Sequence, residues 1–66
     1  MTLRELVKLN AEGVKITIAD RDELKMYYTN INDIKYGYSE VSDEMLDKKV
    51  TKMGVADDRL LVFIEK

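Results

Sequence analysis

The sequence predicts an α+β fold, in which a four-stranded antiparallel sheet is built from two β-hairpins and each hairpin follows a short helix. Two segments have the apolar spacing of a short helix, and four segments alternate apolar with polar side chains as half-buried strands do. The tripeptides Ile18-Ala19-Asp20 and Val55-Ala56-Asp57 also occupy equivalent places in the two expected hairpins. The expected element order is therefore αββ-αββ, in a single domain that spans residues 1–66.

The first helix is expected over residues 2–9. Thr2 and Glu5 have the spacing of a capping box, in which each side chain satisfies a free backbone N–H group at the start of a helix. Gly13 is suited to the left-handed conformation that ends many helices. One face of the segment is apolar because three of its residues follow the i, i+3, i+4 spacing of a helix, namely Leu3, Leu6 and Val7.

The first hairpin is expected to join strands at residues 14–19 and 24–29 through a polar turn at residues 20–23. Each strand places an apolar residue at every second position, which is the pattern of a strand with one buried face. These apolar residues are Val14, Ile16 and Ile18 in the first strand and Leu24, Met26 and Tyr28 in the second.

Residues 30–41 are expected to form either a continuation of the preceding strand or an ordered loop. Asn30, Asn32 and Asp33 favour a turn. The apolar and aromatic residues that follow would share one side of an extended segment, and Gly37 could mark a bulge there.

A second helix of one to two turns is expected over residues 42–47. Ser42 is a good N-cap, and Asp43 and Glu44 would lie where the positive end of a helix favours anions. A second hairpin should follow, with strands at residues 50–56 and 59–65.

The last strand is apolar on both sides, which is typical of a strand inside a sheet. Leu60, Val62 and Ile64 point one way, whereas Leu61 and Phe63 point the other. If the first helix covers the former set, then either residues 30–47 or a partner chain must cover Leu61 and Phe63. Exposed apolar patches on small proteins commonly mark interfaces.

The composition argues against catalysis and against cofactor, metal or small-molecule binding. The chain has no His and no Cys, so the commonest general base and the strongest nucleophile are missing. Its carboxylates cluster at expected turns and helix ends, where acidic residues serve solvation and capping. We therefore expect a protein that is not an enzyme. Since disulfides and zinc sites are also excluded, a homodimer is the expected means of stabilising so short a chain.

The lack of Cys, the short apolar runs and the polar N-terminus indicate a cytoplasmic protein without a membrane segment. The longest apolar run, residues 60–64, is far shorter than the roughly 20 residues of a membrane span. Arg4 and Glu5 in the first turn argue against a signal peptide.

The net charge of −2 includes an acidic stretch at residues 39–47 and no basic stripe, which argues against nucleic acid as a partner.

The tyrosines are unevenly distributed, because all four fall within the twelve residues from Tyr27 to Tyr38. Tyr is enriched at protein interfaces, but it is also a good strand residue that pairs across hairpins. The alternative function is single-stranded nucleic-acid binding. The rings of Tyr27 and Tyr36 would stack on bases, and Lys25 and Lys35 would neutralise phosphates. The candidate interaction surface consists of Tyr27, Tyr28, Tyr36, Tyr38, Leu61 and Phe63.

Four stretches resemble short uncharacterised proteins encoded by phages and prophages of Gram-positive bacteria. They cover roughly half of the chain, and the tyrosine-rich stretch departs from the pattern. The resemblance implies a mobile-element accessory protein that contacts a host or phage protein, and it supplies no site residue. The function expected from the sequence is therefore that of a non-enzymatic, self-associating protein-interaction module. The similar stretches are residues 2–6, 14–18, 42–50 and 58–64.

Overall fold

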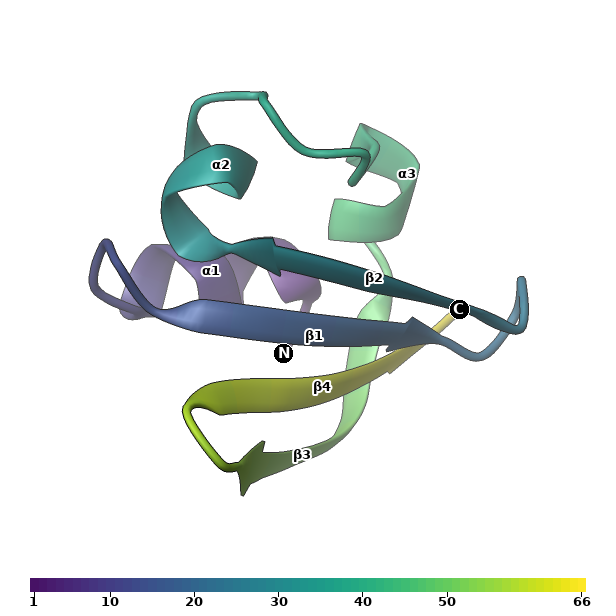
Figure 1. Cartoon of the computed structure of the whole chain (residues 1–66). Coiled ribbons are helices and arrows are strands. Elements are labelled where there is room, and N and C mark those ends of the chain that lie inside the picture. The colour runs from purple at the N-terminus through teal and green to yellow at the C-terminus, as the bar shows by residue number, and fades with distance from the viewer.

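The computed structural model describes all residues 1–66 and contains three short helices and one four-stranded sheet (Figure 1). The predicted α+β class is confirmed. None of the helices combines the length and the apolar character needed to cross a bilayer. In chain order the elements are α1 (Leu3–Leu9), β1 (Lys15–Asp20), β2 (Lys25–Asn30), α2 (Ile31–Lys35), α3 (Asp43–Leu46), β3 (Lys49–Ala56) and β4 (Arg59–Glu65).

Helix α1 begins with the predicted capping box. The Thr2 hydroxyl accepts a hydrogen bond from the Glu5 backbone N–H, and the Glu5 carboxylate accepts one from the Thr2 N–H at 2.9 Å. The helix ends at Leu9, as the predicted range of residues 2–9 requires, and the Asn10 side chain donates to the Leu6 carbonyl at 2.8 Å. Gly13 does adopt a positive φ of 89°, but it lies in the loop before β1.

The sheet is mixed, with the strand order β2-β1-β4-β3. Both hairpins pair antiparallel as predicted, and β4 has the interior position expected from its apolar faces. The central pair β1 and β4 is parallel, however, so the prediction of an entirely antiparallel sheet is wrong. The alternation of apolar and polar residues in a strand shows which face is buried, but it does not show whether the neighbouring strand runs parallel or antiparallel. Here the long helical connection between β2 and β3 provides the crossover that a parallel arrangement needs.

The stretch expected to be a strand or a loop contains an additional helix, α2, so the order αββ-αββ is incomplete. The Asn30 side chain accepts from the Asp33 N–H at 2.8 Å and starts the helix. Ile31 and Ile34 then lie on one helical face and are both buried. Helix α3 matches its prediction, with the Ser42 hydroxyl accepting from the Met45 N–H.

All three helices cover the same face of the sheet. Every second residue of β1 and β4 points into the core beneath them, and the remaining residues point to the opposite face, which carries no helix (Figure 1). We call this uncovered side the open face. The core consists of Leu3, Leu6, Val7, Ile16, Ile18, Ile31, Ile34, Met45, Val62 and Ile64.

A buried ion pair joins the end of β1 to the start of β3. The Lys48 ammonium lies 2.8 Å from both carboxylate oxygens of Asp20, and the two side chains are only 4% and 0% exposed. The Asp20 carboxylate also accepts from the backbone N–H groups of Asp22 and Glu23, which closes the turn between β1 and β2. One carboxylate thus fixes both this turn and the chain that leaves α3.

Asp22 completes the cluster around the buried ammonium. Its carboxylate lies 3.2 Å from the Lys48 ammonium and accepts the Lys66 backbone N–H at 2.9 Å. The hydrogen bond to Asp20 raises the pKa of Lys48 above its ordinary 10.5; desolvation opposes this shift and Asp22 reinforces it. Desolvation acts to raise the pKa of Asp22, but the hydrogen bonds from Lys66 and Lys48 outweigh it and lower that pKa.

Removing the buried carboxylate should be among the most destabilising single changes. In an Asp20→Ala variant the Lys48 ammonium stays buried with only the partly exposed Asp22 beside it, and we expect the free energy of unfolding to fall by roughly 3–5 kcal/mol. Urea denaturation followed by circular dichroism measures this loss. Asp47→Ala, which removes an exposed partner of Arg4, is the control and should have little effect. Similar losses in both variants would contradict a special role for Asp20.

The same cluster predicts how stability depends on alkaline pH. Because folding raises the pKa of Lys48, its contribution is complete below 10.5 and is lost as the pH rises through the higher folded-state value. A double variant, Asp20→Asn with Lys48→Met, removes both charges and should lack this alkaline loss. Thermal unfolding midpoints measured from neutral pH to above pH 10.5 compare this double variant with the unchanged protein. Parallel curves would refute the assignment.

Candidate functional site

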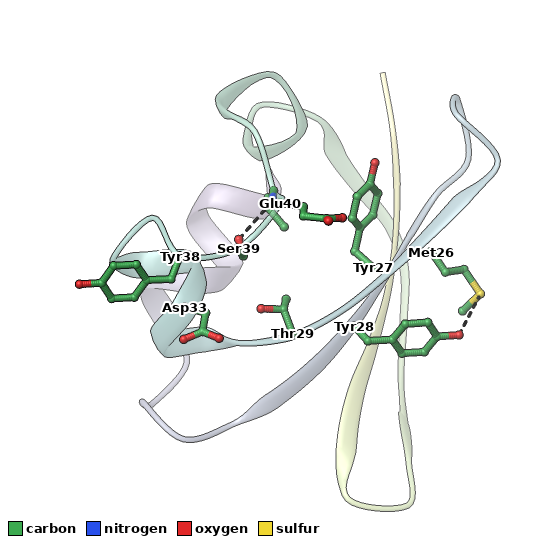
Figure 2. A pocket seen from close by; sticks show the side chains of 9 residues that line it. Met26, Tyr27, Tyr28, Thr29, Asp33, Tyr38, Ser39 and Glu40 are labelled. Carbon is green, nitrogen blue, oxygen red and sulfur yellow. Dashed lines mark hydrogen bonds between the residues drawn. The ribbon is translucent and has the colours of Figure 1, made fainter.

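A groove runs along the outer edge of β2. It has a volume of about 340 Å³ and lies between β2 and the loop that follows α2 (Figure 2). Three of the four predicted tyrosines line it, so the structure brings half of the candidate surface together. The nine lining residues are Met26, Tyr27, Tyr28, Thr29, Asp33, Tyr38, Ser39, Glu40 and Val41.

The tyrosine rings divide the groove into two sides. Tyr27 and Tyr28 are adjacent in β2 and therefore point to opposite faces of the sheet. In Figure 2 the Tyr27 ring lies near Glu40 on the helix side, whereas Tyr28 extends beside Met26 on the other side. The Tyr28 hydroxyl approaches the Met26 sulfur at 3.8 Å. Tyr38 lies at the far end of the groove and is 81% exposed.

The groove also presents unpaired backbone groups of β2. The Ile31 N–H donates to the Val14 carbonyl, which fixes the phase of the β1–β2 ladder. Residues that bond the neighbouring strand alternate with residues that direct their N–H and C=O outward. Counting back from Ile31, Tyr28 and Met26 direct these groups outward, and no turn, loop or cap hydrogen bond uses them. Two donors and two acceptors are thus available to an added strand.

The loop that follows α2 lines the side of the groove opposite β2, and it is held at both ends. The Tyr38 N–H donates to the Asp33 carbonyl at 2.8 Å, and Val41 packs against the core cluster. Between them, the Ser39 hydroxyl accepts from the Val41 N–H at 3.2 Å. The wall is therefore built into the fold, and a ligand would meet a groove that already exists.

The charge of the groove is negative. Asp33 and Glu40 are its only charged residues, and neither carboxylate has a cation within ion-pair distance. Figure 2 shows the Glu40 carboxylate directed toward Tyr27. Lys25 is the one basic residue of β2, and its ammonium lies over the Tyr27 ring at 5.1 Å from the ring centre. The groove therefore favours a ligand with positive charge.

Tyr36, the fourth tyrosine, does not line the groove. It follows α2, and its hydroxyl donates to the Glu12 carboxylate in the loop before β1. Lys35 donates to the Asn10 carbonyl in the same region. The set proposed for nucleic-acid binding is thus divided, because Lys25 and Tyr27 belong to β2, whereas Lys35 and Tyr36 contact the loop before β1.

Leu61 and Phe63 lie on the open face, away from α2 and α3. Residues 30–47 therefore leave them uncovered, and both side chains are half-buried among their strand neighbours. The Lys52 ammonium lies 5.8 Å from the centre of the Phe63 ring. Across the sheet these two residues share the open face with Met26 and Tyr28, so β2 connects the groove with the open face.

Comparison with known proteins identifies no relative of this chain. No protein-family model, no curated protein and no solved structure matches the chain.

The contact between Tyr36 and Glu12 predicts a distinct tyrosine titration. The hydrogen bond to Glu12 and the negative charge of that carboxylate raise the pKa of Tyr36 above 10.0. In a spectrophotometric titration, one tyrosine should therefore ionise later than an ordinary tyrosine. Glu12→Gln should remove the delay, and Tyr36→Phe should remove that step altogether. If the late step survives in the Tyr36→Phe variant, it belongs to another residue.

Proposed function

We propose that this chain is a non-enzymatic protein-interaction module that binds an extended segment of a partner by strand addition to β2. The observation that carries the proposal is the groove, in which outward backbone groups of Met26 and Tyr28 lie between tyrosine rings and carboxylates. In strand addition, main-chain hydrogen bonds provide affinity, and pockets for alternate side chains provide specificity. The β2 edge offers both.

The two sides of the groove indicate the chemistry of the partner. A strand added beside β2 points alternate side chains to the helix side and to the open face. On the helix side these side chains would meet Tyr27 and Glu40, which suit a Lys or Arg. On the open face they would meet Met26 and Tyr28, which suit an apolar residue. The proposed ligand is therefore an extended segment that alternates basic and apolar residues.

The expectations about catalysis, the partner, the cellular location and the homodimer are not part of this proposal and stay predictions. Catalysis is not part of the proposal, because the groove offers neither His nor Cys and its two carboxylates serve to attract a basic ligand. The partner as a host or phage protein, the cytoplasmic location and the homodimer are separate questions. The homodimer is addressed by the experiment on the open face below.

The test uses two short capped peptides, one alternating Val and Lys and the other alternating Val and Glu. The Val-Lys peptide should shift the amide resonances of Met26 and Tyr28 in the NMR spectrum of the full chain and protect these amides from hydrogen exchange, since they would become paired. The Val-Glu peptide should bind at least tenfold more weakly, because its carboxylates would face Glu40 and Asp33.

Matched variants identify the surface. Glu40→Lys reverses a charge inside the groove and should abolish binding of the Val-Lys peptide. Glu44→Lys makes the same change on exposed α3, outside the groove, and should leave binding nearly unchanged. Unprotected Met26 and Tyr28 amides at saturating peptide, or equal losses in both variants, would disprove strand addition at this site.

A further inference from the structure

The open face presents four rows of side chains across the sheet. The strand register aligns Tyr28, Thr17 and Leu61 in one row, and Met26 lies opposite Ala19 in the next. The small residues of β1 therefore lie between larger side chains on both neighbouring strands. From one end of the strands to the other, the rows are Lys15, Arg59 and Ala56; Tyr28, Thr17, Leu61 and Gly54; Met26, Ala19, Phe63 and Lys52; and Arg21, Glu65 and Lys49.

Charge is segregated between the two sides of the molecule. The open face and its adjoining turn, Asp57-Asp58, carry five cations but only three carboxylates, a net charge of +2. Since the whole chain has a net charge of −2, the remaining residues carry −4. The protein is therefore acidic overall but has a basic open face. The cations are Lys15, Arg21, Lys49, Lys52 and Arg59, and the carboxylates are Asp57, Asp58 and Glu65.

The cations lie at the two ends of the apolar rows. At one end Asp58 pairs with Lys15 at 2.9 Å and with Arg59 at 3.6 Å, and with the adjacent Asp57 this end has no net charge. At the other end Glu65 pairs only with Arg21, and no carboxylate lies within ion-pair distance of the lysines at positions 49 and 52. A ligand that crosses the face would thus meet paired charges, then apolar and aromatic surface, then the unpaired positive charges of Lys49 and Lys52.

Two aromatic rings lie in the middle rows of the face, and a hollow lies between Phe63 and the turn that joins β1 to β2. Tyr28 is 69% exposed, and Phe63 is half-buried two strands away, about 12 Å along the diagonal of the sheet. Beside Phe63 lies an open hollow of about 260 Å³, with Ala19 among its lining residues. Its rim includes Leu24, which is 90% exposed. This volume is below that of a pocket for a drug-sized ligand, but it accommodates one planar ring.

We propose that the open face binds single-stranded nucleic acid, with bases on Tyr28 and Phe63 and phosphates at the end that carries Lys49 and Lys52. Such binding combines a positive surface along the backbone with aromatic side chains on which bases stack. A second copy of the chain is disfavoured as the occupant, because face-to-face packing would bring two surfaces of charge +2 together. This site shares Tyr28 with the groove but does not use the groove carboxylates Asp33 and Glu40, and it is not the set of residues expected from the sequence for nucleic-acid binding.

The experiment measures the fluorescence anisotropy of labelled single-stranded oligothymidine and oligouridine with the full chain. For about three neutralised phosphates, affinity should fall about 20-fold between 50 and 200 mM salt. Lys52→Glu should weaken binding strongly, whereas Lys8→Glu makes the same charge change on exposed α1 and should have a small effect. Phe63→Leu keeps an apolar side chain but removes a stacking ring, and should cost about tenfold or more.

The outcomes separate this proposal from its alternatives. Absence of binding at low salt, equal losses in the Lys52→Glu and Lys8→Glu variants, or equal binding to duplex DNA or to anionic lipid vesicles would overturn it. Sedimentation of the free chain as a dimer that Leu61→Ser dissociates would assign the face to a second copy instead. Glu40→Lys, which should abolish peptide binding in the groove, should leave nucleic-acid binding intact, so either proposal can fail alone.

Discussion

The buried pair of Asp20 and Lys48 is the constraint on which the arrangement of this fold depends. A buried ammonium is tolerated only when its charge and hydrogen bonds are satisfied, and here one carboxylate does this while also closing the first hairpin. Lys48 immediately follows α3 and precedes β3, so the pair fixes where the helical crossover returns to the sheet. The helices are thereby held on one face, and the other face is left uncovered.

The same crossover creates the groove. Helix α2 begins directly after β2, and the chain then turns back along the outer edge of that strand before α3 starts. An edge strand is ordinarily protected from pairing with other chains. In this protein the returning loop, anchored by Tyr38 and Val41, does not pair with β2 but is separated from it by the groove. The edge is thus accessible but flanked, which favours an added single strand over extended aggregation.

Local patterns in the sequence predict the local elements of this structure, and they fail where distant segments meet. The capping box at Thr2 and the apolar alternation of the strands were sufficient for α1 and both hairpins. They could not give the parallel central pair, because alternation carries no direction. The turn-favouring Asn30 proved to be a helix cap. Glu40 and Lys48 gave no sequence signal, because their roles depend on partners distant in the chain.

The open face also has a consequence for how the molecule meets any charged interface. Opposite net charges on the two sides of a thin sheet give the protein an electric dipole roughly perpendicular to the strands. A polyanionic matrix such as a cation-exchange resin would therefore meet this acidic protein preferentially through the side opposite the helices at neutral pH and low salt. Adsorption in a single orientation would leave the acidic, helix-covered side directed toward solution.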